Sequence, residues 1–191
     1  MIRDLIRKNR AYRRFYQEIP IGRQQLMEWV DLARQTASGA NLQPLKYVLS
    51  CEERRNKLIF PLLKWAGYFK DWDGPAEGEQ PSAYIIMLSD KEIRPNPAFC
   101  DQGIACQSIL LGATEAGFGG CIIGAVDFKE LREALVIPDK FDIIMVIALG
   151  KPKETVVLED VDKSGDIKYY RDANGVHHVP KRRLEDIIIQ G

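Results

Sequence analysis

The segment Phe99–Ala116 limits the fold more than any other, because as an α-helix it is apolar on nearly every side. A helix that is apolar all round belongs in the interior of a protein, covered by other elements. Its small residues would also let a neighbouring helix approach closely; they are Gly103, Gly112, Ala113 and Ala116. The sequence therefore predicts a buried helix, which ends in a tight turn at Gly117–Gly120.

The apolar runs around this helix predict strands in a layered fold. Phe141–Leu149 is almost continuously apolar, which is typical of a central strand, and Ala83–Leu88 is similar. Further strands are expected at residues 46–51 and 121–123. Helices are expected at residues 3–9, 23–36 and 52–63, and from 127 to before Pro138. The dipeptide Asn174-Gly175 predicts a hairpin between residues 166–171 and 176–179. Because these elements do not form regular βαβ units, we expect an α+β fold with a mixed central β-sheet and helices on both faces.

Length and composition exclude several classes of protein. The 191 residues favour one domain over 1–191, in which the aromatic-rich residues 64–80 form a flap or lid. Twenty-seven basic residues balance 27 acidic ones, so no overall field attracts nucleic acid or a membrane surface. The apolar runs are far shorter than the roughly 20 residues of a membrane span, and the charged N-terminus lacks a signal-peptide pattern. We therefore expect a cytoplasmic protein.

The cysteines and histidines do not have the spacing of a metal site. The four cysteines form no C-x-x-C pair, and His177 and His178 are the two histidines of the chain. We expect the cysteines to be small core residues or free thiols in a reducing compartment, and the histidines to be structural.

Two pairs of basic side chains have a spacing that suits a phosphate. Arg10 and Arg13 are three residues apart and would share a face at a helix end, where two guanidinium groups can bind a phosphate or a carboxylate. Lys181 and Arg183 alternate, so on an extended chain both point to one side. Each pair alone is also typical of a solvated basic surface, either a helix end that complements the helix dipole or a basic tail.

The turn Ser38–Pro44 is a third candidate site. It combines a hydroxyl, a glycine and the side-chain amides of Asn41 and Gln43, which can pair with the edge of a heterocycle. An ordinary turn after a helix has the same composition, so both interpretations are open at this point. The sequence contains no G-x-G-x-x-G motif and no P-loop.

Taken in order, these segments resemble the nitroreductase family of FMN-dependent oxidoreductases. The family pattern R-R-S-x-R-x-F is similar to Asn9-Arg10-Ala11-Tyr12-Arg13-Arg14-Phe15, and S-x-x-N-x-Q-P matches Ser38–Pro44. The long buried helix with its glycine pair, the strand end Leu149-Gly150-Lys151-Pro152 and the P-K-x-R sequence at Pro180–Arg183 follow in the same order. The resemblance covers essentially the whole chain, although no single motif is specific.

The resemblance implies an α+β layered sandwich that works as an intertwined homodimer, with FMN at the dimer interface. It implies that Arg10, Lys181 and Arg183 hold the FMN phosphate and that Arg13 lies near the pyrimidine edge of the flavin. The other cofactor-binding residues that it implies are Ala11, Ser38, Gly39, Ala40, Asn41 and Gln43, with Ile122, Ile123 and Gly124 against the ring.

The activity that the resemblance implies depends on the flavin, so no catalytic side chain and no metal are expected. Electrons would pass from NADH or NADPH through FMN to a small organic acceptor, such as a nitroaromatic or a quinone, by a ping-pong mechanism. A flavin-binding protein without reductase turnover would carry the same motifs. A small interaction domain built on Arg3–Arg14 is a third hypothesis, and the balanced charge argues against nucleic acid as its partner.

Overall fold

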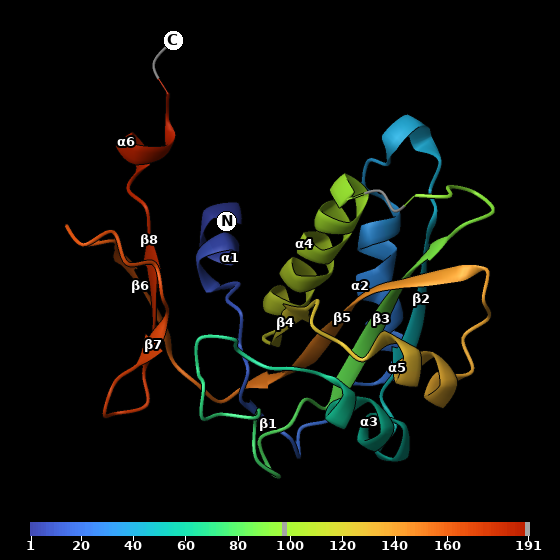
Figure 1. The fold of residues 1–191 in the computed structure, drawn as a ribbon, viewed down its shortest axis with the longest axis horizontal. Coiled ribbons are helices and arrows are strands. Elements are labelled where there is room, and N and C mark those ends of the chain that lie inside the picture. Colours follow the sequence, from blue (N-terminus) through green and yellow to red (C-terminus); the bar gives the residue numbers. More distant parts are fainter. Residues whose placement is uncertain (97–98, 190–191) are drawn as a thin grey trace.

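The computed structural model describes residues 1–96 and 99–189 and contains a five-stranded sheet with helices against both faces (Figure 1). The strand order is β1 (Phe15–Tyr16), β5 (Phe141–Pro152), β3 (Ala83–Asp90) and β2 (Leu45–Ser50), and β4 (Gly119–Ile123) also pairs with β5. The predicted central position of β5 is confirmed. The strand pairs are antiparallel, so among the described residues the mixed character expected for this sheet is limited to one parallel bridge, Ala11–Gly120.

The two faces of the sheet support two separate cores. Every residue of β3 is buried, because successive side chains point to opposite faces and both faces are covered. Residues 83, 85 and 87 pack with α2 (Arg23–Arg34) and α4 (Phe99–Glu115). Residues 84, 86 and 88 pack with α3 (Glu53–Ile59) and α5 (Phe128–Leu135). The predicted α+β architecture with helices on both faces is therefore confirmed.

Helix α4 is buried on the side that faces the sheet, but this chain does not cover all of it. Gly112 lets α2 approach, since a Cβ atom there would lie 2.5 Å from the Leu32 side chain. On the opposite side Gly103 and Gln107 are exposed, and Ile104 is 40% exposed. The prediction of a helix buried all round thus holds for one side only, because on the other side α1 contacts α4 without burying these residues.

Residues 64–80, called the flap below, contain no helix or strand, as expected for a loop. The helix predicted before it, at 52–63, is shorter: α3 ends at Ile59 and one 3₁₀ turn, Phe60–Leu62, follows around Pro61. The flap is anchored at its start by Trp65, which is buried in the second core. Gly74, with φ of 126°, lies so close to the Trp65 ring that a Cβ atom would come within 2.5 Å of it.

The C-terminal part forms a small second sheet beside the first (Figure 1). In it β8 (His177–Lys181) pairs in parallel with β6 (Val156–Asp160) and in antiparallel fashion with β7 (Tyr170–Arg171). The predicted hairpin at Asn174-Gly175 is confirmed, whereas β6 was not expected. On the middle strand β8, His178 lies 3.1 Å from Glu159 and 3.4 Å from Asp172.

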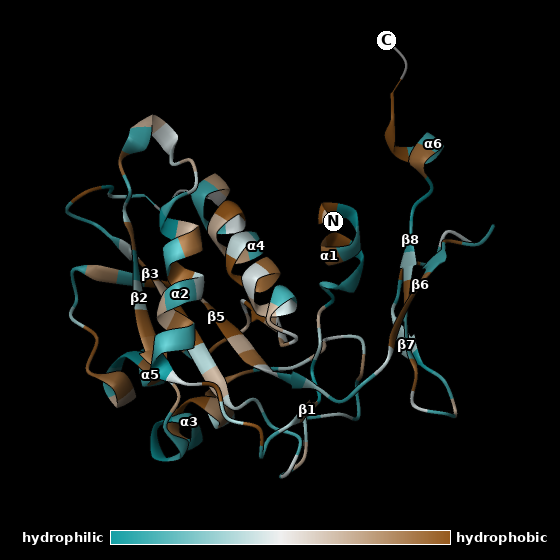
Figure 2. Cartoon of the chain, turned by 180° about the vertical axis from the view of Figure 1, so that it is seen from behind, coloured by the Kyte–Doolittle hydropathy of each residue, from teal (hydrophilic) through white to brown (hydrophobic). Residues whose placement is uncertain are grey.

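Both ends of the chain expose apolar side chains. The short helix α6 (Leu184–Ile187) projects from the rest of the molecule, and the apolar segment after it is brown in Figure 2. Ile189 in this segment is 88% exposed. At the other end, α1 (Ile2–Lys8) buries none of its residues and exposes Ile2 and Ile6. Within the described residues no helix has the length and apolar character to cross a membrane.

Candidate functional site

The arginine segment Arg10–Arg14 lies along the start of β4. The backbone N–H of Tyr12 donates to the carbonyl of Gly120 at 3.1 Å. This close approach requires glycine, because a Cβ atom at Gly119 would lie 2.6 Å from the Tyr12 ring. The glycine pair, which the sequence indicated only as a turn, therefore provides the surface on which the predicted cofactor-binding segment rests.

Arg10 has the environment of an anion-binding side chain. One of its terminal nitrogens donates to the carbonyl of Ile6 at 2.5 Å, while its Nε is buried without a hydrogen-bond partner. Among the described residues neither Arg10 nor Lys181 forms an ion pair with a carboxylate, whereas Arg183 lies 3.5 Å from Glu185. Because buried polar atoms normally have partners, the free Nε of Arg10 fits a ligand such as a phosphate.

The residues predicted to lie against a flavin ring follow directly on β4. Ile122 is 47% exposed, Ile123 is buried, and a Cβ atom at Gly124 would meet open space. Burial raises the pKa of the neighbouring Cys121 thiol to about 12, and the charge of Arg13 opposes this rise. Arg13 is therefore close enough to β4 to act on its side chains, and the Cys121 thiol is not a nucleophile at neutral pH.

The turn at Ser38–Gln43 has an unusual backbone that a buried carboxylate stabilises. Ala40, Asn41 and Gln43 have φ values of 50°, 55° and 53°, in the left-handed region that is costly for residues other than glycine. Asp101, in the first turn of α4, accepts hydrogen bonds from the Ser38 hydroxyl at 2.6 Å and from the backbone N–H of Gly39 at 3.0 Å. The sequence analysis missed Asp101, although a carboxylate in a first helical turn is a recognisable signal.

Within one chain the predicted site residues fall into separate groups. The Ser38–Gln43 turn contacts the start of α4, whereas the arginine segment contacts Gly120, just beyond its end. With a rise of 1.5 Å per residue, the ends of this helix are about 25 Å apart. The turn also lines an open groove of about 690 Å³ between α2 and the edge strand β2. The third group, Lys181 and Arg183, lies at the end of β8.

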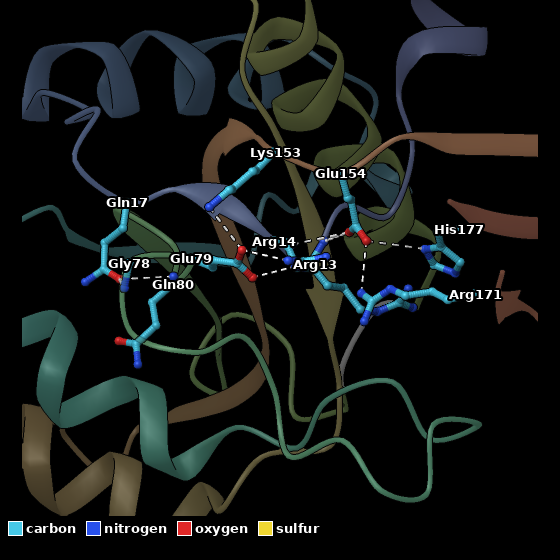
Figure 3. A network of polar contacts seen from close by, with 10 residues as sticks. All are labelled: Arg13, Arg14, Gln17, Gly78, Glu79, Gln80, Lys153, Glu154, Arg171 and His177. Carbon is cyan, nitrogen blue, oxygen red and sulfur yellow. Dashed lines mark hydrogen bonds and ion pairs between the residues drawn. The ribbon is translucent and has the colours of Figure 1, made fainter. Parts of the chain in front are cut away.

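Two carboxylates that the sequence analysis missed hold the arginine segment in place (Figure 3). Glu79, at the end of the flap, lies 2.7 Å from an Arg14 terminal nitrogen and 3.0 Å from Lys153 Nζ. These cations hold the pKa of Glu79 down at about 2. Glu154 accepts hydrogen bonds from the backbone N–H groups of Arg13 and Arg14 and forms an ion pair with Arg171. Their partners are distant in sequence, so no local pattern could reveal them.

Aromatic side chains connect the flap to this segment. The Arg13 guanidinium lies over the ring of Tyr169 at 4.8 Å, and the Tyr68 ring lies 4.8 Å from the same tyrosine. Phe69 also contacts Tyr169, at 5.1 Å between ring centroids. The flap therefore closes onto the residues that surround Arg13, next to the predicted flavin position.

Comparison with known proteins gives one consistent result. The model of the nitroreductase family matches residues 6–151. A nitroreductase family protein from Clostridium novyi NT is 25% identical, with a TM-score of 0.66 over 80% of this chain and 87% of its own. One from Streptococcus pneumoniae TIGR4 is 17% identical, with a TM-score of 0.67 over the full length of both chains. A protein from Exiguobacterium sibiricum 255-15, solved in complex with FMN, is 18% identical, with a TM-score of 0.65 over 81% and 89%. No curated protein matches the sequence at a significant level.

Proposed function

The chain belongs to the nitroreductase family of oxidoreductases, and on this premise we propose that it binds FMN and reduces a small organic acceptor with electrons from NADH or NADPH. The observation that carries the proposal is the state of Arg10, whose buried Nε lacks a partner and which pairs with no carboxylate of the described residues. The same segment presents Arg13 beside β4. A phosphate at Arg10 and a flavin ring along β4 would use both features.

Lys181 and Arg183 complete the phosphate site in this proposal. Both are exposed, and Lys181 lies at the end of β8, whose first residue, His177, lies beside the arginine segment's partner Glu154. Charge-assisted hydrogen bonds to a phosphate are stronger than neutral ones. They would also contribute more than the exposed ion pairs that Arg183 forms with Glu185 and Asp186 of α6. Three cations would then surround one phosphate dianion.

The remaining site residues would come from a second copy of the chain. The Ser38–Gln43 turn is too far from the arginine segment to contact the same FMN within one chain, so a homodimer would bring the two together. The exposed Ile104, the apolar residues of α1 and the tail after α6 would be covered in such a dimer. This arrangement makes the cofactor site a property of the dimer.

The protein's own contribution to the reaction would be electrostatic. NADH or NADPH would donate electrons and a nitroaromatic or quinone would accept them, in ping-pong order, through the redox chemistry that FMN supplies when bound. The Arg13 guanidinium would stabilise negative charge at the pyrimidine edge, and its contact with Tyr169 would keep it in place. The flap would exclude water from the acceptor site.

The absorption spectrum of the purified protein tests the proposal. We expect a bound flavin that denaturation releases as FMN, and that loses its colour when NADH or NADPH is added without oxygen. Release of FAD, or a colourless protein that takes up no FMN, would contradict the proposal. A bound flavin that neither nicotinamide reduces would instead favour a flavin-binding protein without turnover. Light scattering should give the mass of a dimer, with flavin loss on forced dissociation.

A further inference from the structure

We propose that Glu154 is a positioning residue of the FMN site, which holds the arginine segment, the flap and β8 in one fixed arrangement. The inference rests on the proposed function, because the site that Glu154 would organise is the FMN site. Glu154 lies two residues after the end of β5, the central strand, in the connection to β6.

The first connection runs to the arginine segment. The Glu154 side chain is 0% exposed. Its Oε1 accepts the backbone N–H groups of both Arg13 and Arg14, the latter at 3.3 Å (Figure 3). A carboxylate that accepts from two successive N–H groups fixes the backbone direction at that point. The Arg13 side chain is then aimed by Glu154 although the two side chains do not pair.

The second connection runs through Arg171. Its Nη2 lies 3.0 Å from Glu154 Oε2. The other neighbour, His177, lies at 3.8 Å, and neither of its ring nitrogens has a hydrogen-bond partner. Burial lowers the pKa of His177 to about 4, so its ring is neutral at pH 7. Arg171 therefore supplies the positive charge that this buried carboxylate requires.

The flap is held by the same guanidinium. Arg171 lies over the Trp72 ring at 4.5 Å and over the Phe69 ring at 4.9 Å. Because Arg171 is fixed by Glu154, the position of these two flap residues depends on a residue more than 80 positions away in sequence. Loss of the ion pair would remove this connection between the flap and Glu154.

The strand β8 is the third element in this arrangement. His177, its first residue, pairs with Arg171 across the β7–β8 ladder and donates its backbone N–H to the carbonyl of Thr155 at 2.9 Å. Thr155 follows Glu154 directly. The direction of β8, and with it the position of Lys181 at its end, is therefore set from the segment that carries Glu154.

The test measures FMN affinity in two variants and one control. Glu154→Gln keeps the shape and an acceptor oxygen but loses the charge, and Arg171→Met removes the partner cation. Glu77→Gln is the matched control, because it also removes a carboxylate of this region but lies at an exposed position of the flap, away from the arginine segment. We expect the FMN dissociation constant, from quenching of flavin fluorescence, to rise at least tenfold in both variants and less than threefold in the control.

Two further measurements separate positioning from loss of stability. At saturating FMN, the visible circular dichroism of the bound flavin should change in Glu154→Gln and keep its wild-type form in Glu77→Gln. The FMN dissociation constant of the double variant Glu154→Gln/Arg171→Met should be no higher than that of the single variant that binds FMN less tightly. The reason is that the two side chains act through one ion pair. Additive losses would overturn the inference.

The failures of the two proposals are distinguishable. If the unmodified protein takes up no FMN, the proposed function fails and this inference with it. If the unmodified protein binds FMN and Glu154→Gln binds it equally well with the same circular dichroism, only the inference fails. Should Glu154→Gln not fold, the double variant Glu154→Gln/Arg171→Met decides the question, since it leaves neither a buried carboxylate nor a guanidinium without its partner.

Discussion

Replacing Glu79 by glutamine should make the protein less stable in a pH-dependent manner. The folded-state pKa of about 2, against an ordinary value of 4.5, means that the ionised form is favoured by its contacts with Arg14 and Lys153. At 1.36 kcal/mol per unit the full shift corresponds to roughly 3 kcal/mol. Arg14 and Lys153 are 33% and 38% exposed, so water screens part of this interaction, and we expect Glu79→Gln to lose about 1–2 kcal/mol at pH 7.

The pH dependence has a definite sign. A depressed carboxyl pKa contributes stability that is fully present above the unfolded-state pKa and is lost as the pH falls towards the folded-state value. The difference between wild type and Glu79→Gln should therefore be constant from pH 8 to about 5.5 and have fallen to roughly half by pH 3. Urea unfolding at fixed protein concentration measures it. Equal stabilities at pH 7, or a difference that does not change down to pH 3, would refute the reasoning. Glu77→Gln, at an exposed position of the flap, is the control.

Three further predictions concern the site and the small sheet. Replacing Lys181 and Arg183 together by alanine should weaken FMN binding more than tenfold, since each charge-assisted hydrogen bond contributes about 1.5–3 kcal/mol, while Arg182→Ala should have little effect. Asp101→Ala should destabilise the protein by about 1–3 kcal/mol in urea unfolding, because it leaves the donors of the strained turn without their acceptor. Partial burial alone would lower the pKa of His178, but hydrogen bonds to Glu159 and Asp172 raise it above its ordinary value. The protonated ring therefore stabilises the fold at low pH, and this contribution is lost as the pH rises. In urea unfolding, His178→Ala should accordingly lose more stability at pH 5.5 than at pH 9.

The fold could be predicted from the sequence wherever burial on both faces left a continuous apolar pattern. The strands β3 and β5 and the helix α4 are of this kind, and their predicted ranges agree closely with the structure. The strand β6 was missed, because its face towards solvent mixes polar with apolar residues and its partner β8 follows only after the hairpin. The exposed side of α4 could not be distinguished from the buried side, because both sides carry small and apolar residues. Such residues do not show whether another element covers them.

The candidate site was predictable only in its local parts. The arginine segment and the Ser38–Gln43 turn are short stretches whose residue types indicate anion binding or a strained turn. Glu154 and Arg171 each stand beside another charged residue, Lys153 and Asp172, and nothing near them in sequence marks them as buried. Their role depends on contacts between residues 13 and 154 and between 154 and 171, which only the folded chain brings together.

The position of the arginine segment also determines the order in which the protein can assemble during synthesis. Residues 10–14 are synthesised before their partners, since Gly120 and Glu154 are made more than 100 residues later. At 5–20 residues per second, the 141 positions between Arg13 and Glu154 take on the order of 7–30 s. During this time the segment lacks its contacts with Glu154, although Glu79, the partner of Arg14, has already been made. The arginine side chains favour hydration of the segment until Gly120 and Glu154 have been synthesised. The charges that suit a phosphate in the folded protein therefore also oppose association of the growing chain.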